Sequence, residues 1–455
     1  MEARESTRNQ IIEGVIWKQL LLFFFPILFG TFFQQLYNAA DAMIVGRFVG
    51  KEALSAVGGS TGMLTQMIVG FFVGLSSGAS VIISQYYGAK RPEMVGYAVH
   101  TAVAFSILSG VAMMILGILL TPFMLSAMGT PEDVMDLSIQ YLRIYFLGMV
   151  ANLIYNTGAA ILRAVGDSRR PLYFLMASCL FNIVLDLLLV VVLGLGVAGA
   201  AIATICSQLL SAVLVAVCLM RTKDMYRLSW RQVGLDGRML KRIIRIGFPA
   251  GLQSVMYGFS NVIIQAGFNS LGTDTVAAWA AYSKIDAVFW MMVNSFGIAI
   301  TTFVGQNYGA GKLDRVRKGV GNCMRMTVAA SVIMAVLIYN WGVYGYQLFT
   351  TDAEVIRIGI EMMRYLAPVY VTYVAIEILS GALRGVGDCW IPMMLCCVGV
   401  CVLRVTWVLI VVPRKRDIFT IMFSYPLTWV ITTVLFTIYY LFFSALRRSR
   451  KGMQI

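Results

Sequence analysis

Charged residues are scarce in this sequence. They make up 13% of the 455 residues, whereas a typical soluble domain carries about a quarter, and hydrophobic residues make up 59% with a mean hydropathy of +0.79. Residues 53–89 contain no Asp, Glu, Lys or Arg, and residues 171–220 contain Asp186 alone. Apolar runs of this length cross a bilayer as helices. The sequence therefore predicts an all-α polytopic membrane protein and excludes a soluble domain.

Patterns that mark enzymes and metal proteins are also missing. The eight cysteines include no CxxC spacing, so we expect neither a disulfide framework nor a metal site. Gly311-Lys312 resembles the end of a phosphate loop, but Gln306 stands where that loop needs its first glycine. We expect no enzyme activity and no cofactor, and we expect any transport work to come from an ion gradient.

The net charge of +14 is not spread evenly. Lys and Arg concentrate in every second connection between apolar runs, which is the positive-inside pattern of a membrane protein with both termini in the cytoplasm and an even number of spans. This placement argues against nucleic acid as a partner. The basic groups are Arg4, Arg8, Lys18, then Lys90 and Arg91, then Arg163, Arg169 and Arg170, then residues 221–245, 312–318 and 447–451. Arg47, Lys51 and residues 414–416 are local exceptions to this pattern.

Apolar runs predict twelve transmembrane helices. They cover residues 17–46, 53–84, 94–120, 132–161, 170–193, 197–220, 242–270, 276–305, 318–345, 355–382, 391–412 and 418–445. We expect a cytoplasmic segment at 1–16, a first six-helix bundle at 17–220, a cytoplasmic linker at 221–241, a second six-helix bundle at 242–446 and a basic tail at 447–455.

The two bundles are internal repeats. Leu-Arg-Ala-Val-Gly-Asp begins at residue 162 and Leu-Arg-Gly-Val-Gly-Asp at residue 383; Gln-Tyr-Tyr-Gly-Ala begins at 85 and Gln-Asn-Tyr-Gly-Ala at 306, so both pairs are 221 residues apart. Motifs in one order at one spacing indicate two homologous halves. Six spans per half give both halves the same orientation, which predicts pseudo-symmetric bundles around an axis along the membrane normal, typical of transporters.

Two carboxylates lie within the first-half spans. Asp41 lies nine residues before Gly50 and Asp186 eight before Gly194, and Thr204 lies eight after Gly196. At a rise of 1.5 Å per residue, all three lie about 12–14 Å below one face of the membrane. Tyr37 and Asn182 lie one turn before the two acids. Buried membrane carboxylates are functional by default, so we expect a site for H⁺ or Na⁺; helix neighbours that only stabilise packing are the alternative.

The second half carries different charges. Glu377 and Arg404 are its mid-span pair, and we expect either that they neutralise each other or that Glu377 contacts substrate or a coupling ion. Asp286, close to Lys284, is interpreted as an interfacial residue, and the single histidine, His100, as a packed or interfacial one. The two halves share a fold and differ in chemistry.

The chain resembles the multidrug and toxic compound extrusion (MATE) family. The resemblance rests on the repeated loops, on Pro26, Gln34 and Asp41 in the first span, and on Gly-Leu-Gly-Val-Ala-Gly-Ala from residue 194. It implies a bacterial inner (plasma) membrane protein with two six-helix bundles in a V shape, which exchanges inward-moving protons or sodium ions for outgoing drugs. The DinF-type pattern implies an ion site whose members here are Tyr37, Asp41, Asn156, Asn182, Asp186 and Thr204. The NorM-type pattern has an aspartate where Tyr373 stands.

These observations favour a monomeric efflux antiporter for amphipathic or cationic small molecules. The substrate and second-bundle candidates are Gln34, Glu377 and Arg404. A lipid or glycolipid flippase of the same superfamily is the alternative within transport, and a passive channel or receptor is the alternative from another class. Membrane lipid is an expected partner in every case.

Overall fold

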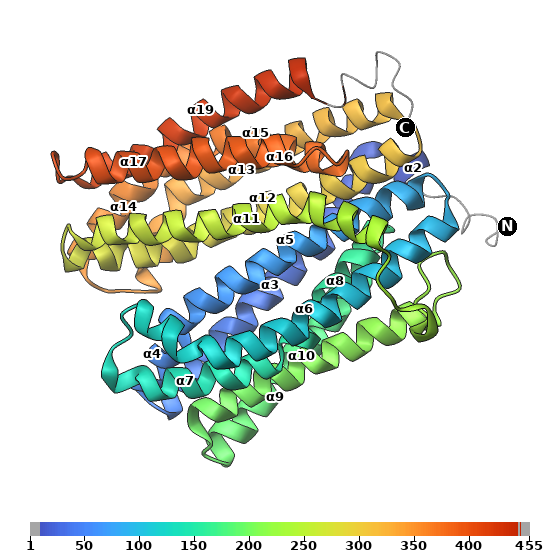
Figure 1. Cartoon of the computed structure of the whole chain (residues 1–455). Coiled ribbons are helices and arrows are strands. Elements are labelled where there is room, and N and C mark those ends of the chain that lie inside the picture. Colours follow the sequence, from blue (N-terminus) through green and yellow to red (C-terminus); the bar gives the residue numbers. More distant parts are fainter. Residues whose placement is uncertain (1–9, 445, 447–455) are drawn as a thin grey trace. The chain divides into compact units, whose positions relative to one another are not determined.

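The computed structural model describes residues 10–444 and 446, and this part of the chain is helical without a strand (Figure 1). Its first half contains α2 (Gln10–Glu13), α3 (Ile16–Phe48), α4 (Lys51–Gly58), α5 (Ser60–Gly88), α6 (Pro92–Ala127), α7 (Glu132–Leu147), α8 (Met149–Ala164), α9 (Arg169–Asp186), the π-helix η1 (Leu187–Val192) and α10 (Gly196–Arg221).

A connection with the short helix η2 (Trp230–Gln232) leads into the second half. That half contains α11 (Gly237–Asn269), α12 (Thr273–Gly309), α13 (Leu313–Gln347), α14 (Ala353–Leu366), η3 (Ala367–Val369), α15 (Val371–Gly385), α16 (Trp390–Cys396), the π-helix η4 (Cys397–Val402), α17 (Leu403–Ile410), α18 (Ile418–Met422), α19 (Ser424–Ile438) and η5 (Tyr439–Phe443).

Each of the twelve predicted spans corresponds to helix, which confirms the fold class. Within the described residues, nine helices are long and apolar enough to cross a membrane, and two bent pairs, α7 with α8 and α14 with α15, qualify together. The twelfth span, α11, falls outside that group. It has 33 residues but carries Ser, Tyr, Asn and Gln side chains along its length, which lower its hydropathy.

Both bent pairs turn by 51°. The first bend lies at Gly148, where a Cβ atom would come within 2.5 Å of Ile205. The second lies at Tyr370, directly after η3, in which Pro368 supplies no N–H to the helix ladder. The two breaks, at residues 148 and 370, are 222 residues apart, close to the spacing of the sequence repeat.

The chain divides into two compact units by its internal contacts. The N-unit comprises Phe25–Gly251, and the C-unit comprises Met1–Phe24 with Leu252–Ile455. The chain therefore passes from one unit to the other inside α3 and inside α11, next to Pro26 and Pro249. The linker 221–241 belongs to the N-unit. The grouping of residues 17–220 and 242–446 into six-helix bundles stays a prediction from the repeat.

In the N-unit, α8 and α10 lie at the centre. Helix α8 packs against α5, α6 and α10, and α10 packs against α7, α8 and α9. The first part of α11 lies against α5 with the backbones in contact. A Cβ on Gly78 would lie 2.3 Å from the carbonyl oxygen of Ile243, and one on Gly247 would lie 2.3 Å from that of Leu75. Small residues permit this close packing of membrane helices.

In the C-unit, α12 packs against α13, α14 and α15, and α15 packs against α19. The short helix α2 lies against α12, with Ile11 and Ile12 buried. Arg315 donates hydrogen bonds to the carbonyl oxygens of Ile11 and Gly14, so a basic side chain stabilises the end of α2. The C-unit is therefore organised around α12.

The contact between α5 and α11 predicts the effect of a single methyl group. Gly78→Ala should lower the midpoint of thermal unfolding in detergent, because the added carbon meets backbone and overpacking costs about 1–3 kcal/mol. Gly96→Ala on α6 is the matched control. Open space surrounds that position, and we expect no loss of stability there. Equal midpoints for the two variants would contradict the close packing.

Candidate functional site

Two acidic side chains meet inside the N-unit. Asp41 on α3 is 6% exposed and Asp186 at the end of α9 is fully buried. Their carboxyl groups are close enough to interact directly. The depth argument from the sequence therefore places the two acids correctly. Depth alone does not determine the direction in which each side chain points from its helix. In the structure the two acidic side chains face each other.

Tyr37 and Thr204 lie beside the acids. The Tyr37 hydroxyl group forms a hydrogen bond with the Thr204 side chain and lies close enough to interact electrostatically with the carboxyl groups of Asp41 and Asp186. Thr204 also donates to the carbonyl oxygen of Ala200 at 3.0 Å, which fixes its side chain on α10. Three helices, α3, α9 and α10, thus contribute side chains to one polar site.

Several polar atoms of the site have no hydrogen-bond partner among the described residues. They are both carboxylate oxygens of Asp186, both amide atoms of the fully buried Asn182, and one oxygen of Asp41. A buried polar atom without a partner costs about 1–3 kcal/mol. Such a group of oxygen and nitrogen atoms is suited to binding a proton, a small cation or an ordered water.

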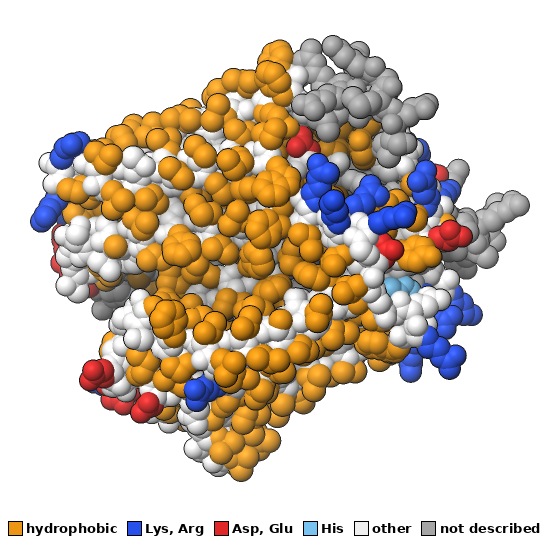
Figure 2. Space-filling view, in the orientation of Figure 1, with side chains coloured by type: hydrophobic (Ala, Val, Ile, Leu, Met, Phe, Trp, Pro, Cys, Tyr) orange, Lys and Arg blue, Asp and Glu red, His pale blue; other side chains and the backbone are white. Residues whose placement is uncertain are grey.

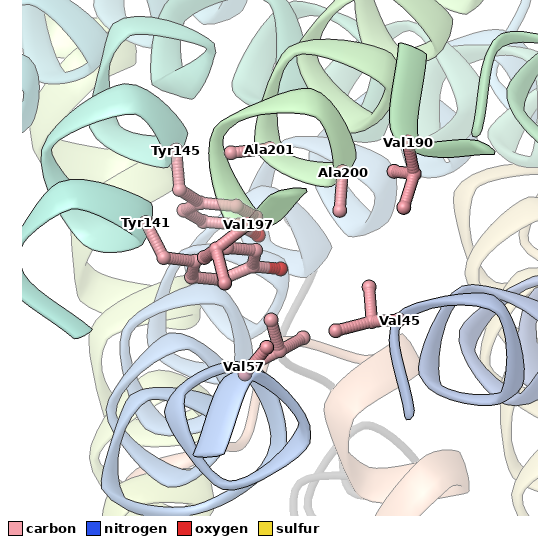
Figure 3. Packing of buried hydrophobic residues seen from close by; sticks show 9 residues of the cluster. Val45, Val57, Tyr141, Tyr145, Val190, Val197, Ala200 and Ala201 are labelled. Carbon is pink, nitrogen blue, oxygen red and sulfur yellow. The ribbon is translucent and has the colours of Figure 1, made fainter. Parts of the chain in front are cut away.

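Two tyrosines of the site were not predicted from the sequence. Tyr141 and Tyr145 on α7 stack with ring centroids 6.2 Å apart, and Tyr141 lies within electrostatic range of both acids. Figure 3 shows the two rings packed beside Val197, with both hydroxyl oxygens directed toward the side of the cluster where Val45 lies. Tyr141 lies nine residues after the start of α7, about 13 Å into the membrane, so the same depth rule would have found it.

Asn156 and Gln34 lie elsewhere. Asn156 donates at 2.9 Å to both the backbone and the side-chain oxygen of Asn152, on its own helix α8. Gln34 is exposed on α3. The structure therefore brings together Tyr37, Asp41, Asp186 and Thr204, keeps Asn182 one turn before Asp186, and does not bring Asn156 into contact with the two acids.

The predicted neutralisation of Glu377 by Arg404 is wrong. Arg404 donates to Thr428 at 2.9 Å and lies over the Tyr425 ring, 4.1 Å from its centroid. Glu377 instead accepts from the Tyr373 hydroxyl at 3.5 Å and interacts with Arg384. The reason is depth. Glu377 lies eight residues, about 12 Å, before the end of α15, whereas Arg404 lies 14 residues, about 21 Å, after the start of the next span at Trp390.

Asp286 is not an interfacial residue. It lies 13 residues into α12, about 20 Å along the helix, and accepts hydrogen bonds from the Tyr370 hydroxyl at 2.5 Å and the Trp290 indole at 2.6 Å. The Tyr282 hydroxyl lies 2.6 Å from that of Tyr370. An ionised carboxylate can only accept hydrogen bonds, so several hydrogen-bond donors directed at Asp286 suit its ionised form. The C-unit thus contains its own buried acid, held by neutral aromatic donors.

The hydrogen bonds to Asp286 predict a stabilising role. Asp286→Asn should lower the midpoint of thermal unfolding, because a bond to a charged group contributes about 1.5–3 kcal/mol and the new amide places donors opposite donors. Asp274→Asn, in the exposed first turn of the same helix, is the matched control and should leave the midpoint unchanged. A tolerated Asp286→Asn would contradict this role.

Known proteins resemble this chain over most of its length. The MatE family profile matches twice, over residues 26–188 and 249–410. The chain is 28% identical over 437 residues to the probable multidrug resistance protein YoeA of Bacillus subtilis, covering 94% of each chain. It is 23% identical over 386 residues to the multidrug export protein MepA of Staphylococcus aureus, covering 82% of each.

Solved structures share the fold. One of them, described as the outward-facing conformation of a multidrug resistance MATE family transporter of the MOP superfamily, superposes with a TM-score of 0.90 at 22% identity, covering 97% of this chain and 98% of that one. The two profile matches begin 223 residues apart, in agreement with the repeat found in the sequence.

Proposed function

Because this chain belongs to the MatE family of membrane transporters, we propose that it is a secondary active multidrug efflux antiporter whose coupling ion binds at Asp41 and Asp186. The names of YoeA and MepA support export of several small molecules. The aromatic and methionine content of the chain, with 27 Met, suits substrates that are amphipathic or cationic. The coupling ion is H⁺ or Na⁺.

The observation that carries the proposal is the meeting of two carboxyl groups in the N-unit interior. Two neighbouring carboxyl groups in a low-dielectric interior are stabilised by a proton shared between them or by a cation bound to both. A proton would be shared by the acids, whereas Na⁺ would take its ligands from their oxygens and those of Asn182, Tyr37 and Thr204. Ion binding would remove negative charge from the protein interior, and ion release would restore it.

Ion binding has to change the shape of the transporter. We place this change in α3, which carries Asp41 and passes between the two units next to Pro26. Proline removes one backbone hydrogen bond from the helix ladder, which makes that turn the easiest to bend. An ion that binds one shape of α3 more tightly shifts the population toward it, and the substrate path would then open to the other side of the membrane.

The energy available is sufficient for export. One elementary charge moved through about 100 mV yields about 2.3 kcal/mol, which supports roughly a fifty-fold concentration ratio of a neutral solute. We place the protein in the bacterial inner membrane with both termini in the cytoplasm, on the support of the basic connections. The acids of the first bundle, together with Tyr373 in place of an acid, support the DinF-type branch.

Gln34 is the proposed contact for substrate in the N-unit. It lies seven residues, or two helical turns, before Asp41 and therefore on the same face of α3, and its side chain is exposed. In the C-unit, Glu377 interacts with Arg384 and Arg404 contacts Thr428 and Tyr425. Glu377 remains proposed for contact with substrate or a coupling ion, and Arg404 for contact with substrate.

Neutral substitutes at the two acids test the coupling site. Asp41→Asn and Asp186→Asn should each reduce gradient-driven export of a cationic dye at least tenfold, because an amide cannot bind a proton and holds a cation weakly. The measurement is dye efflux from energised cells, with protein level determined in parallel. Asp136→Asn, an exposed acid on α7, is the control and should export normally. Wild-type export by Asp41→Asn would remove Asp41 from the mechanism.

Separate ion gradients test the transport class. In proteoliposomes, we expect dye movement against its own gradient when one ion gradient, of H⁺ or of Na⁺, is imposed, and no such movement after that gradient is dissipated. Each turnover should carry the ion in the opposite direction. Ion conductance without counter-transport would indicate a channel, and movement of labelled lipid in place of dye would indicate a flippase.

A further inference from the structure

The connection between α10 and α11 has a fixed fold. It runs from Arg221 to Gly237 and buries two side chains, Tyr226 and Leu228, against the N-unit. The Leu228 N–H donates to the carbonyl oxygen of Leu219 at 2.9 Å, which turns the chain back along the end of α10. We refer to residues 221–237 as the basic linker.

Three helix side chains fix the basic linker in place. His100 Nε2 accepts the N–H of Ser229 at 3.0 Å, and its Nδ1 donates to the carbonyl oxygen of Gly96 at 2.6 Å, so the neutral ring uses both nitrogens. The Thr101 hydroxyl accepts the N–H of Asp236 at 3.2 Å. The Tyr87 hydroxyl donates to Asp224 at 3.0 Å. The linker thus belongs to the folded surface of the N-unit.

The two acids of the linker are held by hydrogen bonds, whereas its basic side chains are exposed. Asp224 accepts from Tyr87 and from the N–H of Met225, and Asp236 accepts from the N–H of Met239. Four exposed basic side chains, Arg221, Lys223, Arg227 and Arg231, form no salt bridge with any described acid. With four exposed bases and one exposed acid, Asp224, the surface of the linker carries a net positive charge.

Two large apolar side chains are exposed among these bases. Trp230 in η2 is 50% exposed and Leu235 is 48% exposed. A water-exposed surface gains nothing from an exposed tryptophan beside basic side chains. At a membrane interface both are favourable, because the ring enters the interfacial layer and the bases bind anionic headgroups. The linker follows the end of a membrane span and precedes α11, so it lies at the level of a bilayer surface. Figure 2 shows Lys and Arg side chains gathered at this end of the helices, beside the single histidine.

We propose that the basic linker is a docking surface for anionic phospholipid headgroups. Lys223, Arg227 and Arg231 bind the lipid phosphates, and Trp230 and Leu235 enter the interfacial layer beside them. The hydrogen bond from the Ser229 N–H to His100 fixes the backbone next to Trp230, and so fixes the position from which the indole ring reaches the lipid. The chemistry that recognises the partner is a dense layer of negative charge next to an apolar layer.

Lipid retention by the purified full-length protein tests this surface. Native mass spectrometry with equal amounts of phosphatidylglycerol and phosphatidylcholine should show preferential retention of phosphatidylglycerol. Lys223→Gln/Arg227→Gln/Arg231→Gln should lower that preference at least tenfold, because each basic side chain near an anionic surface contributes a factor of about five. The control is Arg414→Gln/Lys415→Gln/Arg416→Gln, which removes three exposed charges from the opposite predicted face.

The outcomes separate lipid from other partners. Equal loss of preference in the two triple variants would overturn the proposal, and so would absence of any preference in the wild type. Binding of soluble polyglutamate through the linker without a phosphatidylglycerol preference would assign the surface to an acidic protein segment and also overturn it. Elution of each variant at the wild-type volume in size-exclusion chromatography shows that the fold is intact.

Trp230 supplies an independent measurement. In nanodiscs of phosphatidylglycerol with brominated acyl chains, the fluorescence component that Trp230→Phe removes should be strongly quenched, because bromine quenches only rings at the membrane. The same component should resist a soluble quencher such as acrylamide. Quenching by acrylamide and insensitivity to bromine would place Trp230 in water and overturn the proposal.

Discussion

The electrostatic conflict between Asp41 and Asp186 is the constraint on which the transport chemistry of this molecule depends. Each acid alone would be costly in a membrane interior, and together they are costlier, because like charges in a low-dielectric region repel strongly. The protein does not relieve this conflict with a basic side chain in the described part of the N-unit site. Under the proposed function, a coupling ion bound by the two acids relieves this conflict.

The C-unit handles buried charge in another way. Asp286 receives hydrogen bonds from the Tyr370 hydroxyl and the Trp290 indole, so neutral aromatic groups satisfy this acid. An acid that its own protein satisfies has less to gain from an added ion. Two halves with one fold thus differ in whether their charges are satisfied internally, and this difference supports a coupling role for the N-unit.

The sequence predicted well how far along its helix each site residue lies, and predicted poorly the direction in which its side chain points. Rise per residue is nearly constant in a helix, so counting from a glycine turn placed Asp41, Asp186 and Thr204 at one level. Direction around the helix does not follow from such counting, and the predicted pairing of Glu377 with Arg404 was wrong because each side chain contacts other partners. Tyr141 escaped notice because aromatic residues in apolar spans resemble core packing. Asp286 was misplaced because the neighbouring Lys284 suggested the interface.

The two 51° bends show that the two halves share a backbone path although the residues at the bends differ. At one bend the chain uses Gly148, whose missing side chain admits Ile205, and at the corresponding bend it uses Pro368, whose missing N–H interrupts the ladder. These are unrelated chemical means to one backbone path. The path is therefore set by how the neighbouring helices must pack, and either half can exchange the residue at its bend for another that produces the same angle.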